Sequence, residues 1–229
     1  MKLKGKEMQF VKSTVGGKII LAISGQIMVL FVIVHLIGNS TIFVPGGINA
    51  YAGHLHALTP LVWSFRLLML VIFVSHIYFG IVITLENRAA KPRAYAVNKR
   101  LKTTFAGENM IWTGILLGLF VIGHILHFTA RLTPDISSRL SYLSRGDLFD
   151  VSSMVVGSFQ NGAVASIYLA AMGVLFLHMF HGLQSFFQTM GWNNDRTMPV
   201  IIRFGRITAF IFLIGYGSIP ILIFLRILI

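Results

Sequence analysis

The stretch IILAISGQIMVLFVIVHLIGNSTIF, residues 19–43, contains no charged side chain. At about 1.5 Å of rise per residue, a helix of this length is long enough to cross a bilayer. The whole chain has the same character: of 229 residues, 55% are apolar and only 11% are charged, and the mean hydropathy is +0.79. A soluble domain carries about 25% charged residues. The sequence therefore predicts an integral membrane protein and excludes a soluble, fibrous or disordered chain.

Four more apolar stretches follow the first, separated by charged segments or by loop-forming residues such as Pro45-Gly46-Gly47. The five predicted spans cover residues 19–43, 61–85, 109–130, 162–190 and 207–225. The first stretch is too long for a signal peptide and no small-residue cleavage site follows it, so we expect a retained span. We predict a single transmembrane domain, residues 1–229, folded as an all-α bundle of five membrane-spanning helices.

The lysines and arginines predict the orientation of this bundle, because basic residues gather in cytoplasmic loops. The loop at 44–60 has none, and the three arginines between the third and fourth spans are offset by aspartates. The other segments are strongly basic: Lys2, Lys4, Lys6, Lys12 and Lys18 in the tail, Arg88, Lys91, Arg93, Lys99, Arg100 and Lys102 after the second span, and Arg196, Arg203 and Arg206 after the fourth. We therefore expect a cytoplasmic N-terminus and an external C-terminus, which explains the net charge of +12 without nucleic-acid binding.

Six histidines lie within the predicted spans, where an ionisable side chain is costly and marks a functional candidate. They are His35, His76, His124, His127, His178 and His181. The plain alternative for any one of them is a neutral imidazole that hydrogen-bonds to a neighbouring helix.

The helical rise groups these histidines by depth. It puts His35 about 25 Å and His124 about 23 Å from the cytoplasmic ends of their spans. His76 is expected about 15 Å and His181 about 14 Å from that side. The spacing thus predicts two facing pairs at levels about 10 Å apart. Within the i,i+3 neighbours His124/His127 and His178/His181, depth alone does not choose the paired member.

Two imidazoles that face each other across a bundle are what a bis-histidine b-type haem requires. Such a haem has no open position on its iron and only carries electrons. A zinc ion would instead favour ligands that converge on one level. The chain contains no cysteine, which excludes disulfides, iron–sulfur ligation and a covalently attached c-type haem.

Several segments together resemble a known family. They are TVGGK (14–18), FVIVHLIGN (31–39), NAYAGHLHAL (49–58), GHILHFT (123–129) and YLAAMGVLFLHMFHGLQSFFQTMGW (168–192). The chain resembles, over nearly its whole length, the b558-type di-haem cytochrome b subunit of succinate dehydrogenase/fumarate reductase. The last segment is the most specific part of the match.

The resemblance implies four axial ligands, His35, His76, His124 and His181, and two haems b. It pairs His76 with His181 at the cytoplasmic haem and His35 with His124 at the outer haem. It also implies a bacterial cytoplasmic membrane, in which an iron–sulfur subunit that carries a flavoprotein subunit docks on the cytoplasmic face. Electrons would pass between menaquinone, near the outer haem, and the iron–sulfur subunit.

Residues of the predicted outer side are candidates for binding menaquinone, since a quinone needs hydrogen-bond donors and a proton acceptor. These candidates are His54, His56, Asn49 and Tyr51, together with Arg66. Arg66 also has the rival roles of pairing with a haem propionate or snorkelling to the interface. Arg203 and Arg206 could meet the other propionates, set the topology or contact a partner. No Asp or Glu lies inside a predicted span, which argues against a transmembrane proton path built on carboxylates.

Two other classes of function stay open. The chain could anchor a different respiratory enzyme, such as a hydrogenase or a formate dehydrogenase. It could also be a haem-free transporter or scaffold whose histidines only pack helices. Within the resembled family, succinate oxidation and fumarate reduction use the same parts, so the sequence leaves the direction open, as it does the association of two complexes.

Overall fold

The computed structural model describes residues 13–90, 104–132 and 150–228, and all regular elements within these ranges are helical. The long helices are α2 (Thr14–Ser40), α4 (Thr59–Ala89), α6 (Met110–His124), α9 (Gly162–Thr189) and α10 (Met198–Phe224). The short elements are η1 (Thr41–Phe43), α3 (Gly47–Ala57), α5 (Phe105–Glu108), the π-helix η2 (Ile125–Thr129) and α8 (Val151–Phe159).

Within the described ranges, five helices are long and apolar enough to cross a membrane, which agrees with the predicted number of spans. They are Thr14–Phe43, Thr59–Ala89, Met110–Thr129, Gly162–Thr189 and Met198–Phe224. Large apolar side chains on their outer surfaces are exposed, such as Val71 at 64% and Ile214 at 67%. Apolar surface on this scale is typical of a protein whose solvent is lipid. The chain is therefore a multi-pass membrane protein.

Local signals explain where the helices begin. The Ser13 side chain caps α2 by accepting a hydrogen bond from the N–H of Gly16, and Asn161 caps α9 in the same way. Pro199 stands in the first turn of α10, where its missing N–H costs nothing. Helix α10 thus begins nine residues before the expected start of the fifth span at Ile207, and Arg203 lies within it.

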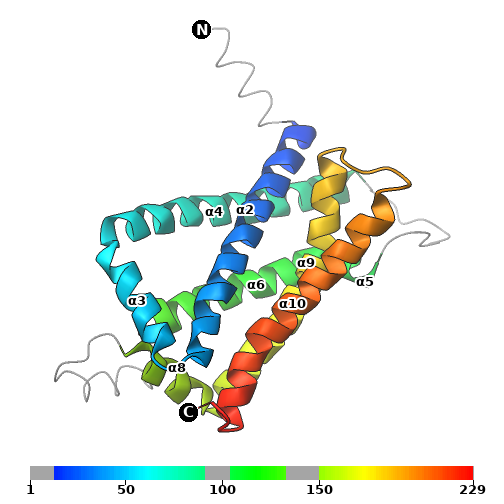
Figure 1. Ribbon diagram of the computed structural model, residues 1–229. Helices are drawn as coiled ribbons and strands as arrows, with labels where there is room; N and C mark the ends of the chain where they lie inside the picture. The colour runs from blue at the N-terminus through cyan, green and yellow to red at the C-terminus, as the bar shows by residue number, and fades with distance from the viewer. Residues whose placement is uncertain (1–12, 91–103, 133–149, 229) are drawn as a thin grey trace.

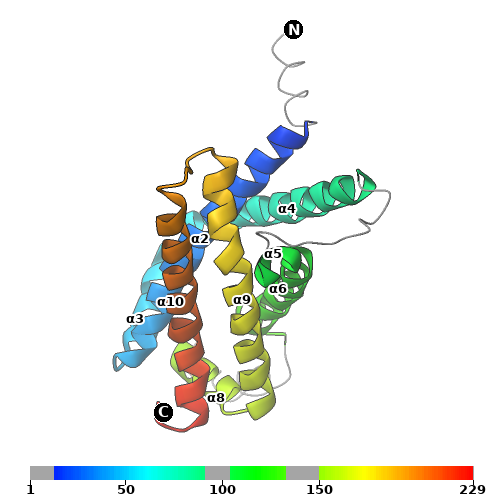
Figure 2. The same cartoon turned by 90° about the vertical axis from the view of Figure 1, so that its right-hand side faces the viewer.

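The two ends of the bundle are formed by different connecting elements (Figures 1 and 2). We call the end at which α2 begins the N-side and the end at which α10 finishes the C-side. In both views the α9–α10 connection lies on the N-side, while α3 and α8 lie on the C-side. Most of the lysines and arginines that predict the orientation fall in 1–12 and 91–103, which lie outside the described residues, as does 133–149.

Helices α9 and α10 form the tightest part of the bundle. Leu183 and Met179 of α9 pack against Ala209 and Phe212 of α10, and all four are buried. Gly205 of α10 faces Leu183, so the two backbones approach closely there. Small residues at such crossings are how helices gain van der Waals contact in a membrane.

The C-side is closed by α3 and α8, which meet through one polar side chain. Asn49 of α3 donates from Nδ2 to Oδ1 of Asp150 at 3.0 Å, and its Oδ1 accepts from the N–H of Ser152 at 2.9 Å. Asp150 in turn caps α8 by accepting from the backbone N–H and the hydroxyl of Ser153. One cluster of buried apolar side chains also joins these elements. It includes Ile48 and Val155, with further members from η1, α9 and α10.

We predict that Asp150→Ala loosens this closure. The substitution removes both the cap of α8 and the acceptor of Asn49, and loss of a helix N-cap costs about 1 kcal/mol of the free energy of unfolding. The expected result is a lower Tm of the purified protein in detergent at pH 7. Asp195→Ala, a carboxylate on the N-side, serves as the control and should leave the Tm unchanged.

The destabilisation should depend on pH. The hydrogen bonds from Ser153, with a smaller contribution from Asn49, lower the pKa of Asp150 from its usual value of 3.8. A lowered pKa in the folded state stabilises the fold above the unfolded pKa, and the stabilisation is lost as the pH falls through the folded value. The difference in Tm between wild type and Asp150→Ala should thus be full at pH 7 and shrink below about pH 4. A constant difference down to pH 3 would contradict this role.

Candidate functional site

Two pairs of histidines meet between the long helices. The C-side pair consists of His35 on α2 and His124 at the end of α6, whose ring centres lie 5.9 Å apart with the ring planes almost perpendicular. The N-side pair consists of His76 on α4 and His178 on α9, with ring centres 6.3 Å apart. Each of four helices therefore contributes one imidazole, and each pair joins two helices that are not neighbours in sequence.

The N-side pair differs from the one that the resemblance implies, since His178 rather than His181 contacts His76. His181 is almost one turn further along α9 and faces α5, where a Cβ on Gly107 would lie 2.8 Å from its ring. Its Nδ1 is buried without a hydrogen-bond partner within the part of the chain that the structure describes. Three residues along a helix turn a side chain by about 60° and shift it by about 4.5 Å, which is enough to change its neighbour.

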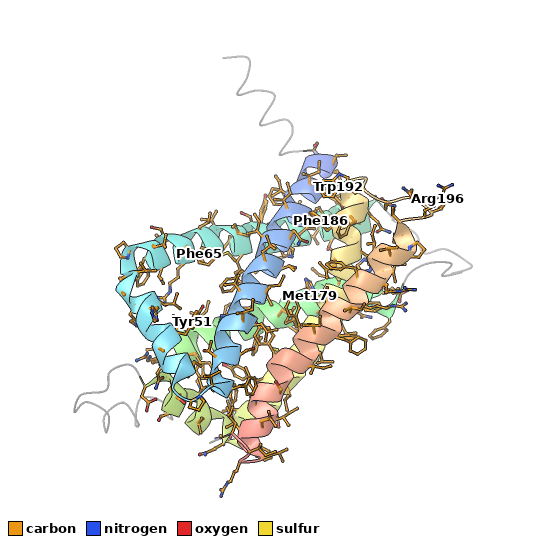
Figure 3. All side chains as sticks on the ribbon, in the orientation of Figure 1. Tyr51, Phe65, Met179, Phe186, Trp192 and Arg196 are labelled. Atoms are coloured by element: carbon orange, nitrogen blue, oxygen red, sulfur yellow. The ribbon has the colours of Figure 1, made fainter. Side chains whose placement is uncertain are left out.

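Met179, the residue after His178, lies on a different face of α9. Met179 is buried in the centre of the bundle (Figure 3), in the cluster that α9 forms with α10. His178 instead contacts α4 and α6. Helix α10 thus packs against the back of α9 and carries no histidine.

The Nδ1 atoms of the N-side pair are held by protein groups. His76 Nδ1 lies 3.2 Å from the carbonyl oxygen of Leu21 and 3.3 Å from Oγ of Ser24. A carbonyl only accepts, so this Nδ1 carries the proton and donates. His178 Nδ1 lies 3.0 Å from the hydroxyl of Thr113, whose own proton is directed at the carbonyls of residues 109 and 110. His76 therefore keeps an unprotonated Nε2, the form that binds a metal. His178 keeps one in the arrangement in which the Thr113 hydroxyl donates to a carbonyl.

Glycines allow the imidazoles of the N-side pair to approach neighbouring helices. A Cβ on Gly25 of α2 would lie 3.0 Å from Cε1 of His76. A Cβ on Gly114 of α6 would lie 3.4 Å from Cε1 of His178. At the edges of both rings, the neighbouring helix therefore presents glycine backbone and no side chain.

The two pairs lie at clearly different levels. On α2, His35 is 11 residues beyond Ser24, which contacts the N-side pair. On α6, His124 is 11 residues beyond Thr113, which also contacts the N-side pair. Both helices give a separation of about 16 Å along the helix axis. This is larger than the 10 Å expected from sequence, because the expected depths depended on estimated span ends.

The spacing within each pair fits a haem. When two imidazoles bind one metal atom from opposite sides with metal–nitrogen bonds of about 2 Å, their ring centres are about 6 Å apart. The observed separations are 5.9 and 6.3 Å. Neutral imidazoles with a hydrogen-bonded Nδ1 supply the nitrogen donors that a b-type haem needs. Perpendicular rings at this distance also match ordinary aromatic packing, which is the haem-free alternative.

The four menaquinone candidates of the C-side have different surroundings. The side chain of Asn49 is committed at both ends to α8, which gives it a structural role. Tyr51 lies against α2 (Figure 3), where a Cβ on Gly38 would be 2.6 Å from its ring. His54 and His56 are exposed on α3, and the Nδ1 of each contacts a carbonyl oxygen of the preceding turn.

The three arginine candidates all lie near helix starts and are exposed. The Arg66 guanidinium lies 5.3 Å from the ring centre of Trp63, close to the start of α4. Arg206 lies 5.5 Å from the ring centre of Phe180 on α9. Arg203 and Arg206 also line an N-side groove of about 390 Å³, together with Asp195, Met198, Pro199 and Ile202. These contacts are typical of arginines at a membrane interface.

No protein family, curated protein or solved structure matches this chain. The functional argument therefore depends on the geometry of the histidine pairs.

We predict that Gly38→Ala disturbs the contact of α3 with α2. The added methyl group must displace the ring of Tyr51, and overpacking of this kind costs about 1–3 kcal/mol. The Tm in detergent should fall. Gly53→Ala on α3 is the matched control: nothing lies within 4 Å of the added carbon, so its Tm should be unchanged or higher. Equal effects of the two substitutions would show that Tyr51 does not join α3 to α2.

Proposed function

We propose that this chain is a di-haem cytochrome b, the membrane-anchor subunit of a complex of the succinate dehydrogenase/fumarate reductase type. One observation carries the proposal: two pairs of imidazoles, each at the spacing of haem ligands, lie about 16 Å apart along the bundle. A substrate site would not need two such pairs, whereas a path for electrons across a membrane does.

The proposed ligands are His35 and His124 on the C-side and His76 and His178 on the N-side. A b-type haem held by two imidazoles supplies a one-electron carrier with no open coordination position. The protein's contribution is to hold each imidazole in the ligating tautomer, which Leu21 and Thr113 do on the N-side. His178 replaces His181 in this ligand set because it is the histidine that contacts His76.

The C-side is proposed to face outward and to exchange electrons with menaquinone. Tyr51 contacts Gly38, which is three residues beyond His35 on α2, so α3 touches α2 about one turn from the level of His35. His54 and His56 are exposed on the same helix and could exchange protons with a quinone. Both polar groups of Asn49 hydrogen-bond to Asp150 and Ser152, so this proposal relies on the other residues of α3.

The N-side is proposed to face the cytoplasm and to carry an iron–sulfur subunit with its flavoprotein partner. The chain itself has no cysteine to hold a cluster, so a separate subunit must deliver or collect the electrons. Co-purification of the intact complex would test this. A flavoprotein with succinate or fumarate activity supports the proposal, whereas a hydrogenase or formate dehydrogenase partner would assign the chain to another respiratory enzyme.

The proposed function predicts the haem content of the complex. The purified complex should show b-type bands in a reduced-minus-oxidised spectrum, with about two non-covalently bound haems per copy of this chain. His178→Ala should lose one haem, because the N-side iron would lack a ligand. His181→Ala, one turn away on the same helix, should keep both.

Two results would contradict parts of this proposal. Loss of a haem from His181→Ala with both haems kept in His178→Ala would restore the pairing implied by the resemblance. A colourless complex would leave the histidines as packing residues and favour the haem-free alternative.

The quinone site gives a separate prediction. Replacing His54 and His56 together by alanine should slow reduction of the haems by a menaquinol analogue at least about tenfold, since a positioned acid or base contributes 10²–10⁴-fold. The haem content should stay at the wild-type level. Ser64→Ala, an exposed polar residue near the start of α4, is the control. An unchanged rate in the double variant would place quinone exchange elsewhere.

A further inference from the structure

Tyr168 of α9 connects two histidines of the C-side. Its hydroxyl lies 2.9 Å from Nδ1 of His127 and 3.4 Å from Nδ1 of His124. His124 is a member of the C-side pair, whereas His127 belongs to neither pair and is buried at 6% exposure. A buried imidazole that faces a half-buried phenol in this way is not explained by helix packing alone.

The ring of Tyr168 is fixed by three phenylalanines. The ring centres of Phe120, Phe128 and Phe159 lie 5.1, 5.6 and 5.0 Å away, each at a steep angle to the phenol. Edge-to-face contacts of this kind favour one ring orientation. The hydroxyl is therefore held between the two imidazoles and cannot turn away from them without breaking the aromatic packing.

The backbone also departs from a regular helix here. The π-helix η2 begins directly after His124, and the N–H of Ala130 donates to the carbonyl of Ile125 at 2.7 Å. A wider turn changes the direction in which the following side chains point, and such turns recur at functional sites. In this chain both His124 and His127 reach the same phenol of α9.

The hydroxyl has one proton, so the three groups allow only one arrangement if His124 is a ligand. His124 must donate from Nδ1 to the phenol oxygen, since only then does its Nε2 keep a lone pair for the iron. The proton of the phenol can then be donated to Nδ1 of His127, which lies 2.9 Å away. By accepting it, His127 favours this arrangement over the opposite one, in which the phenol would donate to His124 and its imidazole would carry the proton on Nε2.

We propose that Tyr168 and His127 are positioning residues that fix the tautomer and the electron donation of His124, and so lower the reduction potential of the C-side haem relative to a haem without them. This inference rests on the proposed function. Hydrogen bonds from a ligating imidazole raise its basicity, and a more basic ligand stabilises the oxidised iron. We expect the effect at the C-side haem, because the histidine of a pair that the phenol of Tyr168 contacts is His124.

The test is a redox titration of the purified complex that follows both haems optically, with the electron paramagnetic resonance spectrum of the oxidised state as a second readout. Tyr168→Phe keeps the ring and removes the oxygen. At a fixed ambient potential, the ratio of reduced to oxidised C-side haem should rise at least about threefold, which corresponds to about 30 mV for one electron. The N-side haem should not change.

Three further variants separate the hydrogen bond from packing. His127→Leu should raise the potential of the same haem, whereas His127→Asn, which keeps an acceptor near the phenol, should restore it towards the wild-type value. Tyr216→Phe is the matched control, because the Tyr216 ring lies 6.2 Å from His35 but its hydroxyl donates to the carbonyl of Val32. If Tyr168→Phe fails to assemble, the two His127 variants decide the question.

The outcomes distinguish this inference from the proposed function. A shift of one haem in Tyr168→Phe and His127→Leu, with rescue by His127→Asn and no effect of Tyr216→Phe, supports the inference. Unchanged potentials in Tyr168→Phe, or equal shifts of both haems, overturn it while the di-haem assignment stands. A wild-type complex without haem overturns both.

Discussion

An imidazole inside a membrane needs a partner for each of its ring nitrogens, and this requirement organises the centre of the bundle. In lipid no water is available, so an unpaired polar nitrogen costs several kcal/mol. Protein groups meet this need at Nδ1 of His76, His178 and His124. The partners come from other helices, so each hydrogen bond also fixes how two helices lie against each other. In the proposed function, the iron atoms of the two haems would bind the Nε2 atoms of the paired histidines.

Four of the five long helices contribute a paired histidine, and the fifth contributes packing alone. Helices α2, α4, α6 and α9 each contribute one histidine to a pair, while α10 contributes none and is packed tightly against α9. Tyr216 of α10 still reaches α2, where it donates to the carbonyl of Val32 at 2.7 Å. Helix α10 therefore stabilises the positions of α2 and α9 from outside, which leaves the inner faces of these helices to the histidines.

The sequence was sufficient for the features that depend on one helix at a time. Hydropathy is a local property, so the number of spans was predicted correctly. The rise per residue grouped His35 with His124 and His76 with a histidine of the fourth span, and the rings meet in these combinations of helices. The start of the fifth helix was predicted too late, because Arg203 and Arg206 were taken as loop residues. Long arginine side chains can reach the interface from within a helix.

Features that depend on how helices face each other could not be predicted. His178 and His181 differ by less than one turn, and only the rotation of α9 relative to α4 decides which of them meets His76. The same holds for Thr113 and Tyr168, which look like ordinary span residues until α6 and α9 are placed side by side. The hydrogen bond of Asn49 could not be predicted either. Asn49 is polar and near the expected quinone site, but its partner Asp150 is 101 residues away in sequence.

The contacts that hold α3 at the C-side determine where a quinone bound to α3 would lie relative to the histidine pairs. Asn49 and Asp150 hold α3 against α8, and Tyr51 holds α3 against α2 at Gly38. This fixes α3 within about one helical turn of His35 along α2. Under the proposed function, a quinone at α3 would meet the C-side pair before the N-side pair. Electrons exchanged with this quinone would then pass the C-side pair first, and the environment of His124 would be where the protein adjusts that exchange most directly.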